Sequence, residues 1–415
     1  MMCRSLLALP LLVSMPALAD TWSFDNRIAV SKNIEAGVFQ HLDSSGRKNI
    51  AVSGNTLAVA WEDNRSGAPQ TYVALKKLEA DEFSTEQRIS TGKSAFAPAI
   101  LALGKGRFLA GWEQDGAVWL RTVSATGLGS VRQISRAEAG QIALATTDGR
   151  RIIAVWNQRT GRFSQIVATM IKIGVKGETI SARAPTPVDP DSPVADQSLP
   201  AVVLTKQGAT VVWEDRRRGH TALLYSHAVA DMKFSPPRPL NEILQKSEQY
   251  GRGSGVTRAA LSVFGDDQIV ATWMDKRGYQ TGYDIYAAFS RDNGASFGAN
   301  ELVQDAFADQ YAQWHPAVTG NGSGQMVIAW DDDRDGTSDI WLSWKIRGGW
   351  STNLAPPPAA DSRQQTNPAI ALDTQGNLHL VWLEQEAENS PGRVMYAVGR
   401  YLRGPQPSGA STPEK

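Results

Sequence analysis

Five aspartates within nine residues form the most concentrated group of potential metal ligands in this sequence, and four of them have the spacing of a calcium loop. The segment 331–339 has the pattern Asp-x-Asp-x-Asp-Gly-x-x-Asp. Its acidic positions are Asp331, Asp333, Asp335 and Asp339. Calcium loops present oxygens at alternate positions, and Gly336 allows the sharp turn, but Leu342 replaces the bidentate glutamate of an EF-hand. The sequence therefore predicts either a site for Ca²⁺ or a capped turn without a metal ion.

The same segment belongs to a turn that recurs after a tryptophan. Aspartate and arginine stand two residues apart in four such turns: Asp63 and Arg65, Asp215 and Arg217, Asp275 and Arg277, Asp332 and Arg334. In a structural interpretation, the aspartate caps the turn and the arginine pairs with an aspartate of the same or the next repeat. In a functional one, the arginines form a partial ring that binds carboxylate, sulfate or phosphate groups bidentately.

Polar residues also stand just before the first strand of several repeats. The residues at this position are Asn49, Ala97, Gln141, Leu199, Arg258, His315 and Asn367. Four of them, Asn49, Arg258, His315 and Asn367, fall in adjacent repeats with long loops, which also carry Tyr250 and Trp314. Long loops with aromatic and polar residues on a rigid scaffold are typical of binding sites. We predict that these six residues surround a ligand, and ordinary solvated loops are the alternative.

Composition excludes several other kinds of protein. The chain has 42 basic and 42 acidic residues, so it lacks the basic surplus that phosphate backbones require, and nucleic acid is not expected as a partner. No apolar run reaches the roughly 18–20 residues of a membrane-spanning helix. The sequence has no HExxH, CxxC or glycine-rich phosphate loop, and only five histidines.

Seven similar segments, each ending in tryptophan, organise the chain. These tryptophans are Trp61, Trp112, Trp156, Trp213, Trp273, Trp330 and Trp382. Most repeats contain about four short strands punctuated by Gly, Asn and Asp, which is typical of all-β proteins. The tryptophan strands are apolar on both faces, as a sheet with neighbours on both sides requires. The pattern predicts an all-β, seven-bladed β-propeller with four antiparallel strands per blade, and an open solenoid is the alternative.

The two ends of the repeat region indicate how a ring would close. The seventh repeat lacks its fourth strand, whereas the segment 27–31 near the N-terminus resembles the fourth strands of other repeats. We therefore expect this segment to complete the seventh blade, within a single domain over 20–403. Closure would remove exposed sheet edges that could otherwise aggregate. Residues 404–415, rich in Pro, Ser and Gly, are expected to be a disordered tail.

The first nineteen residues have the features of a secretory signal peptide. Arg4 is followed by an apolar stretch, and Ala17-Leu18-Ala19 is a cleavage site of small residues. Cleavage after Ala19 would also remove Cys3, the only cysteine, so the mature chain would contain no disulfide. The predicted location is the periplasm or the cell exterior.

One turn motif resembles a known family. Residues 290–297 read Ser-Arg-Asp-Asn-Gly-Ala-Ser-Phe and fit the Asp-box, S-x-D-x-G-x-x-[FW]. In this motif and in its architecture, the chain resembles the sialidase-like, Asp-box (BNR) repeat β-propeller superfamily. Sialidases of that superfamily use three arginines, a tyrosine with a glutamate partner, an aspartate, and an Arg-Ile-Pro signature. The nearest match here, Arg27-Ile28-Ala29, lacks the proline, so no catalytic residue is carried over.

These observations predict a binding or scaffold module rather than an enzyme. Its ligand would be a glycan, an acidic small molecule or a protein partner, bound at the face that carries the long loops. The alternative is a sialidase-like glycoside hydrolase that uses the same face. A tyrosine–glutamate pair beside an arginine cluster in the central pocket would favour the enzyme.

Overall fold

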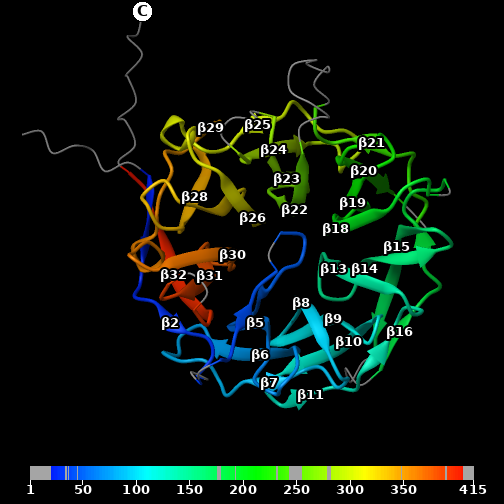
Figure 1. The fold of residues 1–415 in the computed structure, drawn as a ribbon, viewed down its shortest axis with the longest axis horizontal. Helices are drawn as coiled ribbons and strands as arrows, with labels where there is room; N and C mark the ends of the chain where they lie inside the picture. The colour runs from blue at the N-terminus through cyan, green and yellow to red at the C-terminus, as the bar shows by residue number, and fades with distance from the viewer. Residues whose placement is uncertain are drawn as a thin grey trace, which may run out of the picture.

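The described residues of the computed structural model form seven antiparallel sheets arranged as a ring (Figure 1). The structure describes residues 20–404, except for 33–34, 36, 44, 175–178, 192, 230–231, 243–254, 278–281, 347 and 388–389. The predicted signal peptide and all but the first residue of the predicted tail lie outside this part. The prediction of an all-β, seven-bladed propeller is confirmed.

Each blade is one sheet, with its first strand at the centre of the ring. Blade 1 contains β3 (Gln40–His41), β4 (Ile50–Ser53), β5 (Thr56–Asp63), β6 (Gln70–Lys77) and β7 (Gln87–Arg88). Blade 2 contains β8 (Ala95–Gly104), β9 (Arg107–Gln114), β10 (Ala117–Ser124), β11 (Gly127–Leu128) and β12 (Arg132–Gln133). Blade 3 contains β13 (Ala139–Thr146), β14 (Ile152–Thr160), β15 (Phe163–Ile173), β16 (Ile180–Ala182) and β17 (Thr186–Pro187).

The remaining blades follow in sequence order. Blade 4 contains β18 (Gln197–Leu204), β19 (Ala209–Asp215), β20 (Ala222–Ala228) and β21 (Arg238–Pro239). Blade 5 contains β22 (Val256–Phe264), β23 (Gln268–Asp275), β24 (Asp284–Ser290) and β25 (Glu301–Leu302). Blade 6 contains β26 (Gln313–Gly320), β27 (Met326–Asp332), β28 (Asp339–Ile346) and β29 (Gly349–Trp350). Blade 7 contains β30 (Gln364–Leu372), β31 (Leu378–Gln385) and β32 (Arg393–Leu402), with β1 (Thr21–Phe24) and β2 (Ile28–Ala29).

The core lies between neighbouring blades. On β27, Met326, Ile328 and Trp330 pack in a cluster with blade 5, whereas Val327 and Ala329 pack in a cluster with blade 7. Both faces of this strand are therefore buried, as its apolar pattern predicts. All seven repeat tryptophans are completely buried. Burial of such large side chains contributes strongly to the hydrophobic stabilisation of the ring.

The N-terminal segment closes the ring. Ile28 and Ala29 of β2 pair with Tyr396 and Met395 of β32, which confirms the predicted closing strand. The structure adds β1, which pairs with the far end of β32, from Gly399 to Leu402. Inner strands β4 and β30 then pack against each other, so blade 7 meets blade 1.

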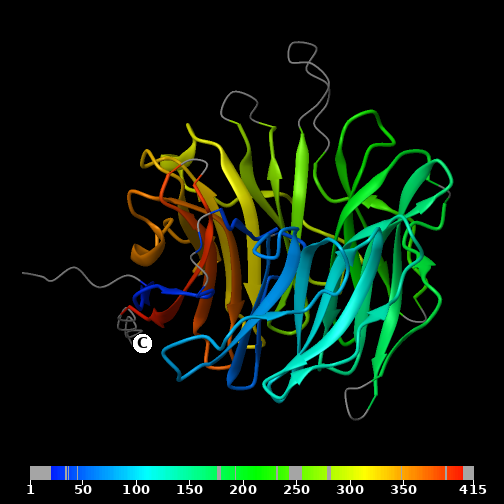
Figure 2. The same ribbon diagram turned by 60° about the horizontal axis from the view of Figure 1, so that its bottom comes forward.

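Two short 3₁₀ helices, η1 (Ala306–Ala308) and η2 (Pro357–Ala359), lie in the connections that leave blades 5 and 6. No helix in the described part of the chain is long and apolar enough to span a membrane. Figure 2 shows the blades from the side, with their strands running between the two faces of the ring.

Candidate functional site

Blade 1 differs from the other blades at the centre of the ring. In blades 2–7 the first strand contains a β-bulge. In blade 2, for example, Phe96 pairs with Glu113 and Ala99 pairs with Gly111, and residues 97–98 form the bulge between these two pairs. In blade 1 the corresponding strand is split into β3 and β4, and residues 42–48 replace the two bulge residues. This segment enters the centre of the ring (Figure 1). We refer to residues 42–48, of which 44 is not described, as the plug loop.

The plug loop reaches across the channel to the inner strands of blades 4 and 5. A Cβ atom on Gly46 would lie 2.8 Å from the carbonyl oxygen of Pro200 and 3.2 Å from that of Ala259, so a larger side chain would not fit without a shift. Two cavities beside the loop have volumes of only about 10 and 20 Å³. A cavity needs about 10–15 Å³ of this volume to hold one water molecule, so these cavities are far too small for a sugar.

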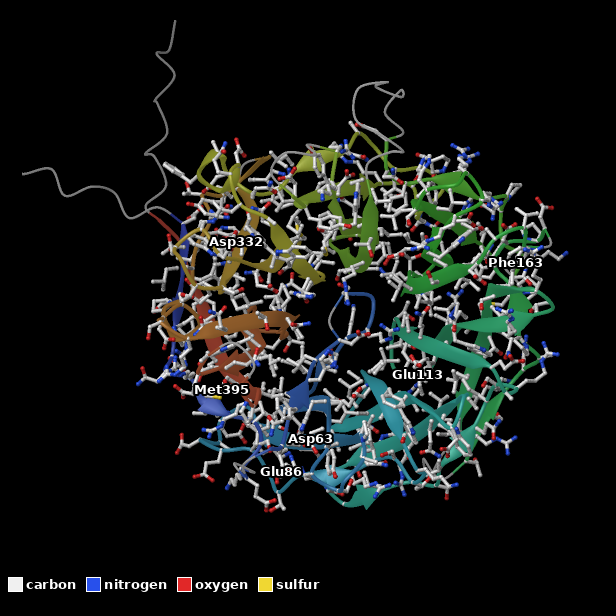
Figure 3. All side chains as sticks on the ribbon, in the orientation of Figure 1. Asp63, Glu86, Glu113, Phe163, Asp332 and Met395 are labelled. Atoms are coloured by element: carbon white, nitrogen blue, oxygen red, sulfur yellow. The ribbon has the colours of Figure 1, made fainter. Side chains whose placement is uncertain are left out.

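Side chains from other blades hold the plug loop in place. Arg258 donates through Nη1 to the carbonyl oxygen of Asp43 at 3.1 Å, and Asn367 donates through Nδ2 to that of Leu42 at 3.0 Å. Within the loop, Arg47 forms an ion pair with Asp43 and lies 3.8 Å from Glu113. Burial lowers the pKa of Arg47 to about 10, despite the attraction of Glu113. Figure 3 places Glu113 near the centre of the ring, with Asp63 and Asp332 farther out.

A second set of contacts joins neighbouring blades around the channel mouth. In blades 2–7, the first bulge residue has a positive φ of 48–58°, an unfavourable conformation for residues other than glycine. In four cases the residue after a repeat tryptophan is acidic, and its carboxylate accepts the backbone N–H of the first bulge residue in the next blade. The acceptor and donor pairs are Glu62 and Ala97, Glu113 and Gln141, Glu214 and Arg258, and Asp331 and Asn367. These four carboxylates therefore stabilise strained backbone, which the sequence analysis did not foresee.

His315 and Asp331 form the remaining polar pair at the mouth. His315 Nδ1 lies 2.9 Å from Asp331 Oδ1, the same oxygen that accepts the N–H of Asn367 at 2.9 Å. Nearby, burial and the positive charge of Arg258 lower the pKa of His41. Within the described residues, no hydroxyl or thiol is hydrogen-bonded to His315, so the pair lacks the nucleophile of a catalytic triad.

The structure brings together three of the six predicted ligand-binding residues and gives each a partner. Arg258 and Asn367 hold the plug loop, and His315 pairs with Asp331. Asn49 is a correction: it is completely buried and donates to the carbonyl oxygens of Ala60 and Pro98. Asn49 occupies the position that Ala99 has in blade 2, directly after the bulge. The plug loop has five more residues than the bulge of the other blades, so blade 1 is out of step with the repeat alignment at this point. Tyr250 lies outside the described residues.

The recurring Asp-x-Arg turns have the structural role. In the four turns the aspartate accepts the indole N–H of the tryptophan two residues earlier, at 3.0–3.2 Å. The arginine pairs with that aspartate and also with a group near the outer strand, as Arg334 does with Asp332 and Asp305. These four guanidinium groups are therefore already paired, which corrects the interpretation that they form a ring for anionic ligands.

The aspartates of the predicted calcium loop point to different partners. Asp331 faces His315 at the channel, Asp333 and Asp335 are exposed on the turn, and Asp339 is buried at the start of β28. No group of three or more His, Asp or Glu side chains in the described residues is arranged to hold a metal ion. The geometry does not fit a four-carboxylate site. Calcium binding stays a prediction that melting in millimolar calcium and in chelator would test.

Exposed aromatic side chains lie on β26, the strand that carries His315, and on the connection that leads into it. Phe307 on η1 is 81% exposed, while Tyr311 and Trp314 are 38% and 40% exposed. Trp314 packs against Tyr283, with the ring centroids 5.3 Å apart at 63°. We refer to Tyr283, Phe307, Tyr311 and Trp314 as the aromatic ledge. The sequence analysis singled out Trp314 but missed Tyr283 and Phe307, since the loop conformation rather than the repeat pattern places them here.

Buried polar groups fix the conformation of the aromatic ledge. The completely buried Gln313 donates through Nε2 to the carbonyl oxygens of Ala308 and Tyr311, at 3.1 and 2.6 Å. Asp305, just before η1, exchanges hydrogen bonds of 2.9 and 3.0 Å with Asn353 in blade 6. These bonds order the backbone that carries the rings, and an ordered backbone loses less conformational freedom when a ligand binds.

The Asp-box-like turn lies elsewhere, between β24 and β25. Asp292 accepts the N–H of Ser296 at 2.9 Å, and Phe297 packs on Tyr225 of blade 4 with the ring centroids 4.9 Å apart. These contacts tie blade 5 to blade 4. They give the motif a structural role in this chain.

Comparison with known proteins supports the fold and no specific activity. No family model matches the chain, and no curated protein matches its sequence. Among solved structures, the polysaccharide lyase Uly1 is similar with a TM-score of 0.58 and 8% identity, over 92% of this chain and 100% of that one. A protein of unknown function from Dyadobacter fermentans is similar with a TM-score of 0.55 and 10% identity, over 92% and 99%.

A sialidase is also among the similar structures. The NanB sialidase from Streptococcus pneumoniae has a TM-score of 0.44 and 9% identity, over 89% of this chain and 70% of that one. A likeness this distant carries no argument about family or activity. At these identities the comparisons show the β-propeller fold alone.

Proposed function

We propose that this protein is an exported, non-enzymatic β-propeller that binds a glycan at the aromatic ledge. The observation that carries the proposal is the set of exposed rings of Phe307, Tyr311 and Trp314 on a connection whose backbone is held by hydrogen bonds, next to a closed channel. Aromatic rings offer large, rigid, amphipathic surfaces on which the apolar faces of sugar rings can stack. Exposed aromatic side chains on ordered loops are typical of binding sites.

A glycan suits this surface better than an acidic small molecule. The arginines of the channel mouth, Arg47 and Arg258, already contact Asp43 of the plug loop. The Nζ atom of Lys276 lies 5.9 Å from the ring centroid of Tyr283. In the described part of this surface the exposed side chains are mainly aromatic, which favours stacking over anion binding.

The closed channel argues against the hydrolase alternative. Propeller glycosidases of the sialidase type need an arginine cluster and a tyrosine–glutamate pair in an accessible central pocket. Here the plug loop occupies the centre, and no tyrosine hydroxyl of the described residues is hydrogen-bonded to a glutamate. The fold also supports chemistry on polysaccharides in the lyase Uly1, so a glycan ligand agrees with the fold without specifying it.

Screening of the mature protein on a glycan array, with hydrolysis and elimination products measured in parallel, tests this proposal. We expect saturable binding of one glycan class and no turnover of the bound glycan. Turnover would instead support the glycoside-active alternative. Absence of binding to every glycan would contradict the proposal, and a pull-down of a protein partner would then be the next measurement.

A further inference from the structure

A third cavity lies away from the channel mouth, between blades 3 and 4. Its volume is about 310 Å³, against the 10–20 Å³ of the cavities beside the plug loop. It is lined by the turn between β13 and β14, the end of β15 and the segment after β20. The turn after the repeat tryptophan lies at the other end of these strands, so this cavity opens on the opposite face of the ring. It is therefore independent of the aromatic ledge.

The floor of this cavity is apolar. Leu204, Ala209 and Ala228 are buried there, and Met170 and Met232 are half-buried against the cluster that contains Leu204 and Ala209. A volume of this size has room for about ten groups the size of a water molecule. Flexible methionine side chains suit a pocket that accepts an alkyl or aryl group of variable shape.

The rim of the cavity is basic. Four cationic residues line it, namely Arg150, Arg151, Lys172 and Arg183. Among the described residues, none in the lining is acidic, and no ion pair joins any of the four to a carboxylate; Asp148, on the turn that carries Arg150, is the carboxylate beside the rim. This concentration of positive charge stands out in a chain whose formal net charge is zero.

Backbone contacts fix the arginines of the rim. The Asp148 carboxylate accepts the N–H groups of Arg150 and Arg151 at 2.9 Å, which orders the turn. Arg151 donates through Nη1 to the carbonyl oxygens of Thr205 and Lys206 at 3.3 and 3.0 Å, and so bridges blades 3 and 4. Arg150, Lys172 and Arg183 are exposed, which leaves their charged groups accessible to a ligand at the rim.

From an apolar floor beneath a rim with four cationic residues, we infer that this cavity binds an amphiphilic anion. The ligand has a carboxylate, sulfate or phosphate head at the arginines and an apolar body of about ten carbon atoms in the floor. Arginine binds such heads through charge-assisted hydrogen bonds, and the apolar body gains from leaving water. A free fatty-acid-like molecule and a chain of an anionic membrane lipid share this chemistry.

Titration calorimetry of the mature protein with decanoate tests the inference. Decanol has the same chain without the charge and should bind at least roughly tenfold more weakly, since it cannot use the basic rim. Val229, which is 64% exposed at the cavity, allows a variant that should fold normally. Val229→Glu should weaken decanoate binding at least roughly tenfold by repelling the anionic head. Val194→Glu, at an equally exposed valine outside the cavity, is the control.

Charge removal gives a second, independent test. Arg183→Gln should weaken decanoate binding several-fold, whereas Arg107→Gln, at an exposed arginine in blade 2, should not. Phosphatidylglycerol vesicles distinguish the source of the ligand: vesicle binding that decanoate displaces indicates a lipid chain, and decanoate binding alone indicates a free ligand. The inference is overturned if decanoate does not bind, if decanol binds equally well, or if vesicle binding persists in excess decanoate.

Discussion

Arg258 in blade 5 donates a hydrogen bond of 3.1 Å to the backbone carbonyl of Asp43, a residue of the plug loop that belongs to blade 1. The two residues are 215 positions apart, and the contact spans the centre of the ring. A side chain predicted from sequence to contact a ligand thus holds an internal loop. Because Arg258 holds the plug loop, we expect its replacement to lower the stability of the protein without changing ligand binding at the aromatic ledge.

Arg258→Ala should lower the free energy of unfolding by about 1–3 kcal/mol, because a charged hydrogen bond is lost and a carbonyl near the channel is left without it. Glycan binding at the aromatic ledge should not change. Urea denaturation and the array signal measure the two effects. Arg132→Ala, at an exposed arginine of β12, is the control and should alter neither. If Arg258→Ala instead loses glycan binding and keeps its stability, Arg258 contacts the ligand, as the sequence predicted.

The contribution of the indole N–H hydrogen bonds to the free energy of unfolding can be measured by comparing two repeat tryptophans. Trp213 donates to Asp215 at 3.2 Å, whereas the indole nitrogen of Trp382 has no hydrogen-bond partner in the described part of the chain. Both rings are completely buried. Trp213→Phe should therefore cost about 1 kcal/mol more than Trp382→Phe, since only the first loses a hydrogen bond. If urea denaturation shows the same loss of unfolding free energy for both variants, the indole hydrogen bond makes no net contribution to stability.

Asp339 should make stability depend on pH. Burial, followed by repulsion from Asp335, raises its pKa from 3.8 to about 7. Between these values the unfolded chain releases the proton while the folded chain keeps it, so this group's stabilising contribution is present below about pH 4 and lost as pH rises through 7. Asp339→Asn copies the neutral form. Its melting temperature relative to the parent should therefore rise from pH 4 to pH 8.

Asp333→Asn is the matched control for this measurement, because Asp333 is exposed on the same turn. Its melting difference from the parent should stay flat across the same range. A flat profile for Asp339→Asn as well would mean that the carboxyl of Asp339 ionises normally in the folded protein.

Removal of residues 20–32 should strongly destabilise the ring. The deletion takes away β1 and β2, the strands that cover the edge of β32, and the ion pair of 2.7 Å between Arg27 and Asp361. We expect a lower melting temperature and aggregation through the exposed edge. Removal of 405–415 serves as the control and should leave melting unchanged. A chain without 20–32 that melts like the parent would refute closure by the N-terminal strands.

The architecture was predictable because it repeats. The spacing of the tryptophans and the apolar faces of strands such as β27 indicated blades, and the missing strand of the seventh repeat indicated closure by β2. Repetition also supported the register argument for Arg258, His315 and Asn367, which occupy equivalent bulge positions with φ of 50–57°.

The candidate site was less predictable because it lies where the repetition stops. Asn49 was misplaced because five extra residues enter blade 1 at the bulge, and an insertion cannot be aligned from a repeat pattern alone. Tyr283 and Phe307 were missed because they lie outside the repeat pattern: the ring contact of Tyr283 with Trp314 depends on how the chain folds before β26, and Phe307 lies on η1 in that connection.

The most direct test of glycan binding at the aromatic ledge is the affinity of two matched variants for the glycan that binds best on the array. Trp314 and Phe96 occupy equivalent positions in blades 6 and 2 and are 40% and 41% exposed, but only Trp314 belongs to the ledge. Trp314→Ala should weaken binding at least roughly tenfold, and Phe96→Ala should leave it within about twofold, with similar melting temperatures for both. Unchanged affinity in Trp314→Ala, or an equal loss in both variants, would contradict the proposed function.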